Sequence, residues 1–184
     1  MQKFIRSETG SLSVEAVLMI PMLFFALTGM FVFFDAYQIR NTTGKAGYTI
    51  ADMLSRETFP INQTYLDDTR SVFAFLARSD VNSRLRVSLV RCVADCEEDD
   101  RTLALDWSKT SGSLSPLMDV DLTQPAYLTR IPTLPLGGRI VLVETEVDYN
   151  PIFNVGLTEM TFRDTVATRL RFAPRLCWES CVGS

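Results

Sequence analysis

The residue types that could support chemistry in this chain are four cysteines, one glutamate beside a long apolar run, and a short acidic cluster. Histidine is absent from the sequence. This absence excludes Ser-His-Asp and Cys-His catalysis, HExxH zinc chemistry and histidine-based pH switching. No other nucleophile–base constellation is evident. The sequence therefore predicts a protein that is not an enzyme and that uses no catalytic residue, cofactor or metal.

The cysteines form two Cys-x3-Cys pairs, Cys92 with Cys96 and Cys177 with Cys181. Zinc sites use such hooks, but thiols outside the cytoplasmic membrane become oxidised, so we favour disulfides. Four cysteines allow three pairings. In a sheet whose strands follow one another in sequence order, Cys92 and Cys177 would lie at opposite ends, which favours the two local pairs. The crossed pairs stay open, because the sequence does not fix the strand order.

The acidic cluster surrounds Cys96 and consists of Asp95, Glu97, Glu98, Asp99 and Asp100. Carboxylate oxygens are ligands for calcium, but the spacing matches no EF-hand loop. We therefore interpret the cluster as a solvated acidic turn of a hairpin.

Length and composition set the class of protein. The chain has 184 residues, of which 47% are hydrophobic and 22% charged, so it can bury a sizeable core. Lys and Arg number 18 against 22 Asp and Glu, for a net charge of −4. Binding of phosphates calls for concentrated Lys and Arg, so nucleic acid is not an expected partner.

The apolar residues gather in one run of 19 residues without a charge, from Ala16 to Phe34. As a helix it is about 28 Å long, close to the roughly 30 Å hydrocarbon core of a bilayer. A small domain rarely surrounds so long a helix on all sides, which argues against a core helix. A secretory signal has a shorter apolar region and a small-x-small cleavage site, whereas Phe33 and Phe34 crowd that place here. We predict a retained membrane-spanning helix, with the N-terminus cytoplasmic and the bulk of the chain outside.

A short leader with Lys3 and Arg6 precedes the apolar run and ends at Gly10, and Glu15 lies at the edge of the run. A carboxylate at membrane depth is costly unless a cation meets it. Cleavage between Gly10 and Ser11 would create an α-amino group about one helical turn from Glu15, able to pair with it in the same or a neighbouring subunit. The alternative is a loop glycine, with a glutamate that favours the helix N-terminus through the macrodipole.

This arrangement resembles the class III signal of prepilins, and it is most similar to the TadE/TadG-like minor pilins, or pseudopilins, of the tight-adherence (Flp, type IVb) pilus system. The resemblance rests on the leader segment Arg6–Gly10, on Ser11–Glu15, and on an apolar helix that contains Pro21. One difference is Ala16, where the family often has an aromatic residue. Near the end of the chain, Val147–Pro151 and Arg163–Arg175 loosely resemble the last two strands of these proteins.

The resemblance implies that a prepilin peptidase cleaves after Gly10, that Ser11 is the mature N-terminus, and that Glu15 pairs with the new amine during assembly. It implies as partners the peptidase, other pilins, the inner-membrane assembly platform and the lipid bilayer. The protein would lie in a bacterial inner membrane with a periplasmic domain, or enter the pilus. The alternative function is an uncleaved, single-pass periplasmic binding module.

Beyond the membrane segment, helical periodicity continues to about Arg56, with a weak point at Asn41–Gly44. Phe59-Pro60 ends this helix, because the residue before proline is pushed out of the α region. A capping-box-like start at Thr64–Asp67 predicts a second helix that reaches about Arg78.

Four later segments alternate between apolar and polar residues and predict strands: Leu85–Leu89, Leu103–Trp107, Val141–Tyr149 and Val166–Phe172. The stretch Ser108–Gly138 is long for a loop, so it contains a short helix or is a mobile surface. Charged residues on the first strand (Arg84, Arg86, Arg91) and on the third (Glu144, Glu146, Asp148) face each other across the sheet or face a partner; the sequence does not choose.

The predicted fold class is α+β: a long N-terminal membrane-spanning helix followed by a pilin-like domain with an antiparallel sheet of about four strands, covered on one side. The predicted domains are a leader at 1–10, the transmembrane and extended helix at 11–58, and the periplasmic α+β domain at 59–184.

Overall fold

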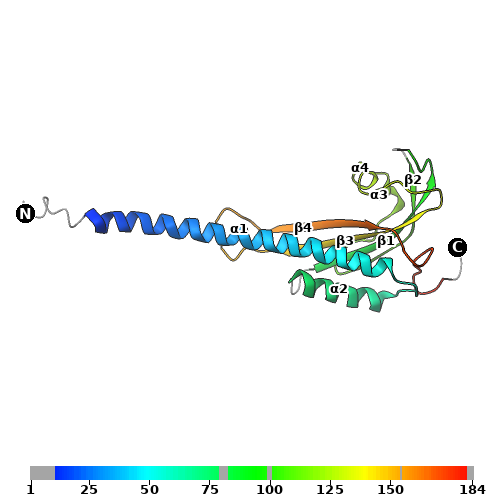
Figure 1. The fold of residues 1–184 in the computed structure, drawn as a ribbon, viewed down its shortest axis with the longest axis horizontal. Coiled ribbons are helices and arrows are strands. Elements are labelled where there is room, and N and C mark those ends of the chain that lie inside the picture. Colours follow the sequence, from blue (N-terminus) through cyan, green and yellow to red (C-terminus); the bar gives the residue numbers. More distant parts are fainter. Residues whose placement is uncertain (1–10, 79–82, 99–100, 154, 182–184) are drawn as a thin grey trace, which may run out of the picture. The chain divides into compact units, whose positions relative to one another are not determined.

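The computed structural model describes residues 11–78, 83–98, 101–153 and 155–181 and shows an α+β protein (Figure 1). Its elements are α1 (Ser11–Ser55), α2 (Gln63–Ala77), β1 (Ser83–Ala94), β2 (Thr102–Ser111), α3 (Asp119–Leu122), α4 (Pro125–Leu128), β3 (Arg139–Tyr149) and β4 (Met160–Thr168). The chain divides into two compact units. One contains α1 up to Gln38 together with Asn150–Met160, and the other contains Ile39–Tyr149 together with Thr161–Ser184.

Helix α1 is continuous through the weak point expected at Asn41–Gly44. Glycine inside a helix costs about 1 kcal/mol relative to alanine, yet packing overrides this preference. Thr43 is fully buried, and a Cβ built on Gly44 would lie 3.8 Å from Oδ2 of Asp164 on β4. The same holds one turn later, where a Cβ on Gly47 would lie 3.5 Å from the Thr145 hydroxyl. The two small residues therefore let this part of α1 approach the sheet closely.

Helix α2 begins one residue before the expected start, because a different residue caps it. The side chain of Asn62 accepts a hydrogen bond from the Tyr65 amide at 2.9 Å. Arg78 ends the helix in the left-handed region. Leu66 and Phe73 are fully buried on its inner face.

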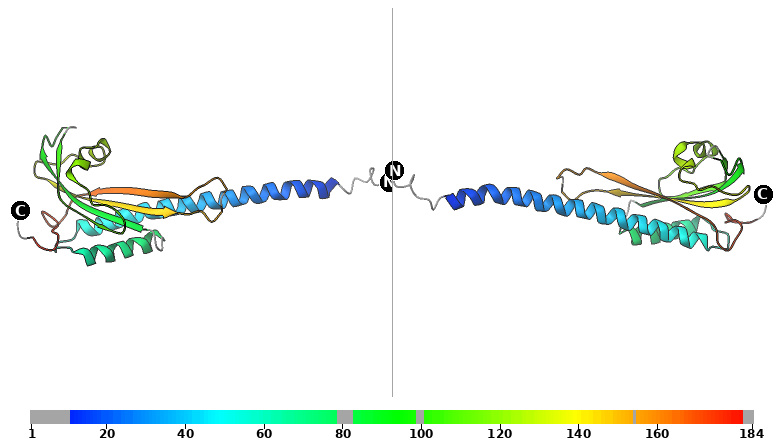
Figure 2. Two further views of the ribbon diagram at one scale, coloured as in Figure 1. Left: turned by 180° about the vertical axis from the view of Figure 1, so that it is seen from behind. Right: turned by 45° about the horizontal axis from the view of Figure 1, so that its top comes forward.

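The four strands form one antiparallel sheet in the order β2-β1-β3-β4, so β1 and β3 are the central strands. The sequential order considered above is therefore wrong. Strand β1 pairs on one side with β2 and on the other with β3, with Arg86 opposite Glu144 and Val87 opposite Val143. Figure 2 shows α2 on one side of the strands and α3 with α4 on the other.

The prediction that the sheet is covered on one side only is wrong, because each face carries its own core. The first core joins α1 and α2 to one face of the sheet. It contains Leu54 of α1, Phe73 of α2 and Val87 of β1. The second core lies on the opposite face, where the chain between β2 and β3 supplies Leu117, Leu122, Ile131 and Leu134 over Val90 and Leu142. The Ser108–Gly138 stretch thus completes β2. Its residues 112–138 then form a folded segment with two short helices, the β2–β3 cover.

A β-bulge at Asp106 changes the face of β2. The register pairs Leu89 with Trp107 but Val90 with Leu105, so Asp106 is the extra residue. A bulge reverses the alternation of side chains. Trp107 therefore packs on the first core and Leu105 on the second, although the sequence pattern placed them on one face.

The fourth strand lies earlier than predicted. It spans Met160–Thr168, whereas the alternation suggested Val166–Phe172. Phe172 is 69% exposed beyond the end of the strand. The amide of the neighbouring Arg171 donates to the Ser55 carbonyl at 2.8 Å, which draws this segment to the end of α1 and away from the sheet ladder.

Candidate functional site

The N-terminal part of α1 is long and apolar enough to cross a membrane. Its most apolar 18-residue window has a mean hydropathy of 2.4, and only 6% of that window is buried. A core helix would be covered, so these values leave a membrane span or a signal sequence. Large side chains such as Leu18, Phe24 and Phe25 are all more than half exposed.

Glu15 lies in the second turn of this helix, four residues after Ser11, where α1 begins. Its side chain is exposed, and it forms no ion pair with any residue in the described segments. The cleavage site predicted between Gly10 and Ser11 includes Gly10, which lies outside the described residues.

The second face of the sheet carries a ladder of charges near the start of β1. Arg84 reaches two carboxylates of β3, with Nε 3.2 Å from Oε2 of Glu146 and Nη2 2.5 Å from Oδ1 of Asp148. Arg163 on β4 binds the other Glu146 oxygen at 2.8 Å. The sequence left open whether these charged residues pair within the chain or with a partner. Most of them pair within the sheet.

Arg86 and Glu144 form the most enclosed of these pairs. Nε and Nη2 of Arg86 lie 2.7 and 2.8 Å from the two oxygens of Glu144, a bidentate geometry. Tyr127 of α4 donates its hydroxyl to Glu144 at 3.0 Å, and Nη1 of Arg86 donates to the Ser115 carbonyl. Burial, followed by the charge of Glu144, raises the pKa of Tyr127 to about 12. This network anchors the β2–β3 cover to the sheet.

Arg91, the third basic residue of β1, does not face the β3 carboxylates. It pairs with Asp106, whose other oxygen binds Arg139 at 2.6 Å. Beside them lies a shallow cleft of about 260 Å³, lined by Arg91, Cys92, Val93, Leu136, Gly137 and Arg139. Sequence reasoning gave Asp106 no role, because an aspartate between Leu105 and Trp107 fits the polar position of a regular alternating strand and gives no local sign of a bulge.

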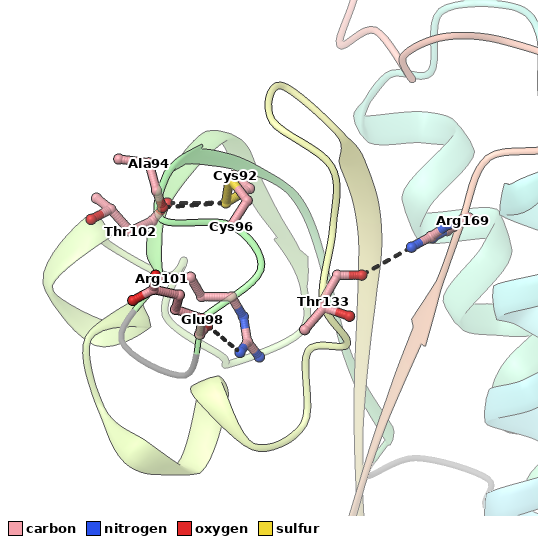
Figure 3. The surroundings of a disulfide bond; sticks show 8 residues. All are labelled: Cys92, Ala94, Cys96, Glu98, Arg101, Thr102, Thr133 and Arg169. Atoms are coloured by element: carbon pink, nitrogen blue, oxygen red, sulfur yellow. Dashed lines mark hydrogen bonds between the residues drawn. A yellow bond between two sulfur atoms is a disulfide. The ribbon is translucent and has the colours of Figure 1, made fainter.

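The Cys92–Cys96 disulfide closes the tip of the β1–β2 hairpin (Figure 3), with the two Cα atoms 5.8 Å apart. Cys92 also exchanges backbone hydrogen bonds with Gly137 and Gly138, which extends the pairing toward β3. Next to it Arg101 is buried and donates to the carbonyls of Leu128 and Ile131 at the end of α4. The hairpin tip therefore holds one end of the β2–β3 cover.

The Cys177–Cys181 disulfide stabilises the segment that follows β4, with Cα atoms 5.2 Å apart. Ile61, in the linker between α1 and α2, donates its amide to the Cys177 carbonyl at 2.9 Å and accepts from the Glu179 amide at 2.7 Å. The Trp107 indole donates to the Leu176 carbonyl at 2.9 Å. The segment thus closes one end of the first core. Both pairings are the local ones that the sequence favoured, although the sequential strand order on which that preference depended is wrong.

No group of three or more Cys, Asp or Glu side chains within the described part of the chain is arranged to hold a metal ion. The acidic cluster is only partly covered by this statement, because Asp99 and Asp100 lie outside the described residues. The two cysteine pairs do not come together and serve two separate loops.

Comparison with known proteins gives no match to a family model, to a curated protein or to a solved structure. Support for a function therefore comes from the architecture. A long apolar N-terminal helix whose last turns pack against a four-stranded antiparallel sheet is a pilin-like architecture. The two disulfides suggest that the sheet domain lies outside the cytoplasm.

Proposed function

We propose that this protein is a minor pilin or pseudopilin that takes part in assembly of a tight-adherence (Flp, type IVb) pilus. The observation that carries the proposal is the N-terminal part of α1. It is uncharged from Ala16 to Phe34, little covered in the monomer, and preceded by the exposed Glu15. An apolar helix that is so little covered needs either lipid or other helices as its environment.

The proposed mechanism is assembly and involves no catalysis. A prepilin peptidase removes residues 1–10, and the new α-amino group of Ser11 lies four residues from Glu15, about 6 Å along the helix axis. An ammonium and a carboxylate attract each other far more strongly in apolar surroundings than in water. Pairing therefore lowers the cost of moving Glu15 among neighbouring helices, in the same subunit or between subunits.

The same helix surface suits both environments that the proposal requires. Lipid tails and the inside of a helix bundle are similarly apolar, so a subunit can pass from the bilayer into an assembly without a large change in solvation. The sheet domain, which its two disulfides stabilise, then initiates, caps or regulates the pilus from the periplasmic side.

The test is mass mapping of the N-terminus after expression with and without the cognate prepilin peptidase. The proposal expects a chain that starts at Ser11 only when the peptidase is present, and expects Gly10→Val to abolish this product. Gly29→Val is the matched control, because a Cβ on Gly29 meets nothing within 4 Å. A chain that starts at Met1 under all conditions would reject the proposal and favour the uncleaved periplasmic binding module.

A further inference from the structure

The connection between β3 and β4 presents apolar side chains to the exterior. Its residues from Asn150 to Thr158 carry no charge. Ile152 is 70% exposed and Phe153 is 50% exposed. Single exposed apolar side chains are common on protein surfaces, but exposed apolar groups that adjoin a larger apolar surface mark a contact site.

This connection belongs to the same compact unit as the part of α1 that ends at Gln38. Figures 1 and 2 show it running alongside the helix. On that part of α1, Val32 and Ala36 share one face and are buried, whereas Phe33 is 55% exposed. The loop therefore lies at the level of the last turns of the apolar run.

That level is the outer end of the candidate membrane span. The uncharged run ends at Phe34, and Asp35 follows it. A helix of this length just spans the hydrocarbon core, so residues 32–36 lie where hydrocarbon gives way to headgroups. Apolar side chains that project at this depth are stabilised by burial in the interfacial zone.

We infer that the β3–β4 loop is a second membrane contact, which inserts Ile152 and Phe153 into the outer interfacial zone of the bilayer beside α1. The inference rests on the proposed membrane anchoring of α1 and adds a lipid-facing surface outside the helix. Lipid is the occupant that the structure favours, because Ile152 and Phe153 belong to the same compact unit as the exposed apolar span and the connection carries no charge before Glu159 at its end. The loop would thereby fix the depth of the anchored domain.

Depth-dependent fluorescence quenching tests this contact in the full chain. All four cysteines are in disulfides, so a new cysteine is the only reactive thiol and accepts the environment-sensitive dye NBD. Ile152→Cys and Phe153→Cys are labelled separately and reconstituted in phosphatidylcholine vesicles. The vesicles carry phosphatidylcholine with a spin label either near the headgroup or near the end of the acyl chain. Phe25→Cys in α1 and Leu136→Cys, an exposed apolar site on the other unit, are the controls.

The expected result is a blue-shifted emission from both loop positions, with stronger quenching by the shallow spin label than by the deep one. The Phe25 probe is expected to show the reverse order, and the Leu136 probe to be unaffected by either. If the loop probes are quenched by neither spin label while the Phe25 probe is quenched, the loop contact is overturned and the anchor stays intact. A blue shift without quenching by lipid would also overturn it, in favour of burial against protein, in this chain or in a second copy of it. A Phe25 probe that escapes both quenchers would overturn the anchoring itself.

Discussion

Arg91 on β1 and Arg139 on β3 stand directly opposite each other in the sheet, and the carboxylate of Asp106 bridges them. Its oxygens lie 3.2 and 2.6 Å from the two Nε atoms. Like charges on opposite residues destabilise a strand pair. The β-bulge places Asp106 between both arginines. Its carboxylate therefore offsets the repulsion between these two like charges at the edge of the cleft.

Replacement of Asp106 by asparagine is expected to destabilise the protein by about 1–2 kcal/mol, because two charge-assisted hydrogen bonds are lost and the arginines repel each other. Chemical denaturation of the full chain in detergent measures the effect. Asp68→Asn, which removes an exposed carboxylate from α2, is the control and should change stability little. The loss should shrink at high salt, since these side chains are partly exposed and salt screens them. Equal losses in both variants would contradict the bridging role.

The stability of the fold is expected to fall as the pH rises from about 10 to about 12. The pKa of Tyr127 is raised to about 12, by burial first and then by the charge of Glu144. An unfolded chain titrates tyrosine near pH 10. A folded pKa above the unfolded one gives stability that is complete below about pH 10 and is lost as the pH passes about 12.

Tyr127→Phe should flatten this alkaline decline, and it should also lower stability at neutral pH by about 1 kcal/mol through the lost hydrogen bond to Glu144. Burial and the nearby Glu57 also raise the pKa of Tyr65 to about 12, so Tyr65 contributes to the same slope, and Tyr65→Phe serves as an independent variant. Denaturation midpoints measured across the alkaline range test both. An unchanged slope in Tyr127→Phe would argue against the buried network.

Gly47 should accept alanine but no larger side chain. A Cβ at this position would be in ordinary van der Waals contact with Thr145 at 3.5 Å and Val166 at 3.8 Å. Gly47→Ala is expected to be neutral or to gain up to about 1 kcal/mol from helix propensity. Gly47→Leu is expected to lose about 1–3 kcal/mol by overpacking. Thermal unfolding of both variants decides the matter, and a leucine variant as stable as the alanine variant would show that α1 is not held closely against the sheet.

Glu15 should matter for assembly and not for insertion. Glu15→Leu removes the carboxylate that the proposed amine pairing requires, so membrane insertion should persist while piliation falls. Glu15→Asp keeps the charge and should retain part of the activity. Ser13→Leu, two residues away and about half a turn round the helix, is a control for added apolar bulk. Membrane fractionation and counting of pili measure the two effects. Normal piliation in Glu15→Leu would refute the pairing.

The sequence alone predicted the features that depend on local pattern. The uncharged run from Ala16 to Phe34 specifies a long apolar helix by composition, and the alternation in Leu85–Leu89 and Val141–Tyr149 specifies strands by the two-residue period of side chains. The local disulfides were favoured from the sequence only for a sequential strand order. They form although that order is wrong, since short Cys-x3-Cys loops bring their thiols together with little help from the rest of the fold.

Only the tertiary structure decided how those pieces meet. The order β2-β1-β3-β4 places β1 between its hairpin partner β2 and the strand β3, which is distant in sequence, and no local pattern encodes the pairing with β3. The bulge at Asp106 moved Trp107 to the other face because one extra residue reverses the alternation, and the second core exists because the β2–β3 cover buries Val90 and Leu142. These outcomes depend on long-range packing, in which the free energy of burying a whole surface outweighs the preference of any short segment.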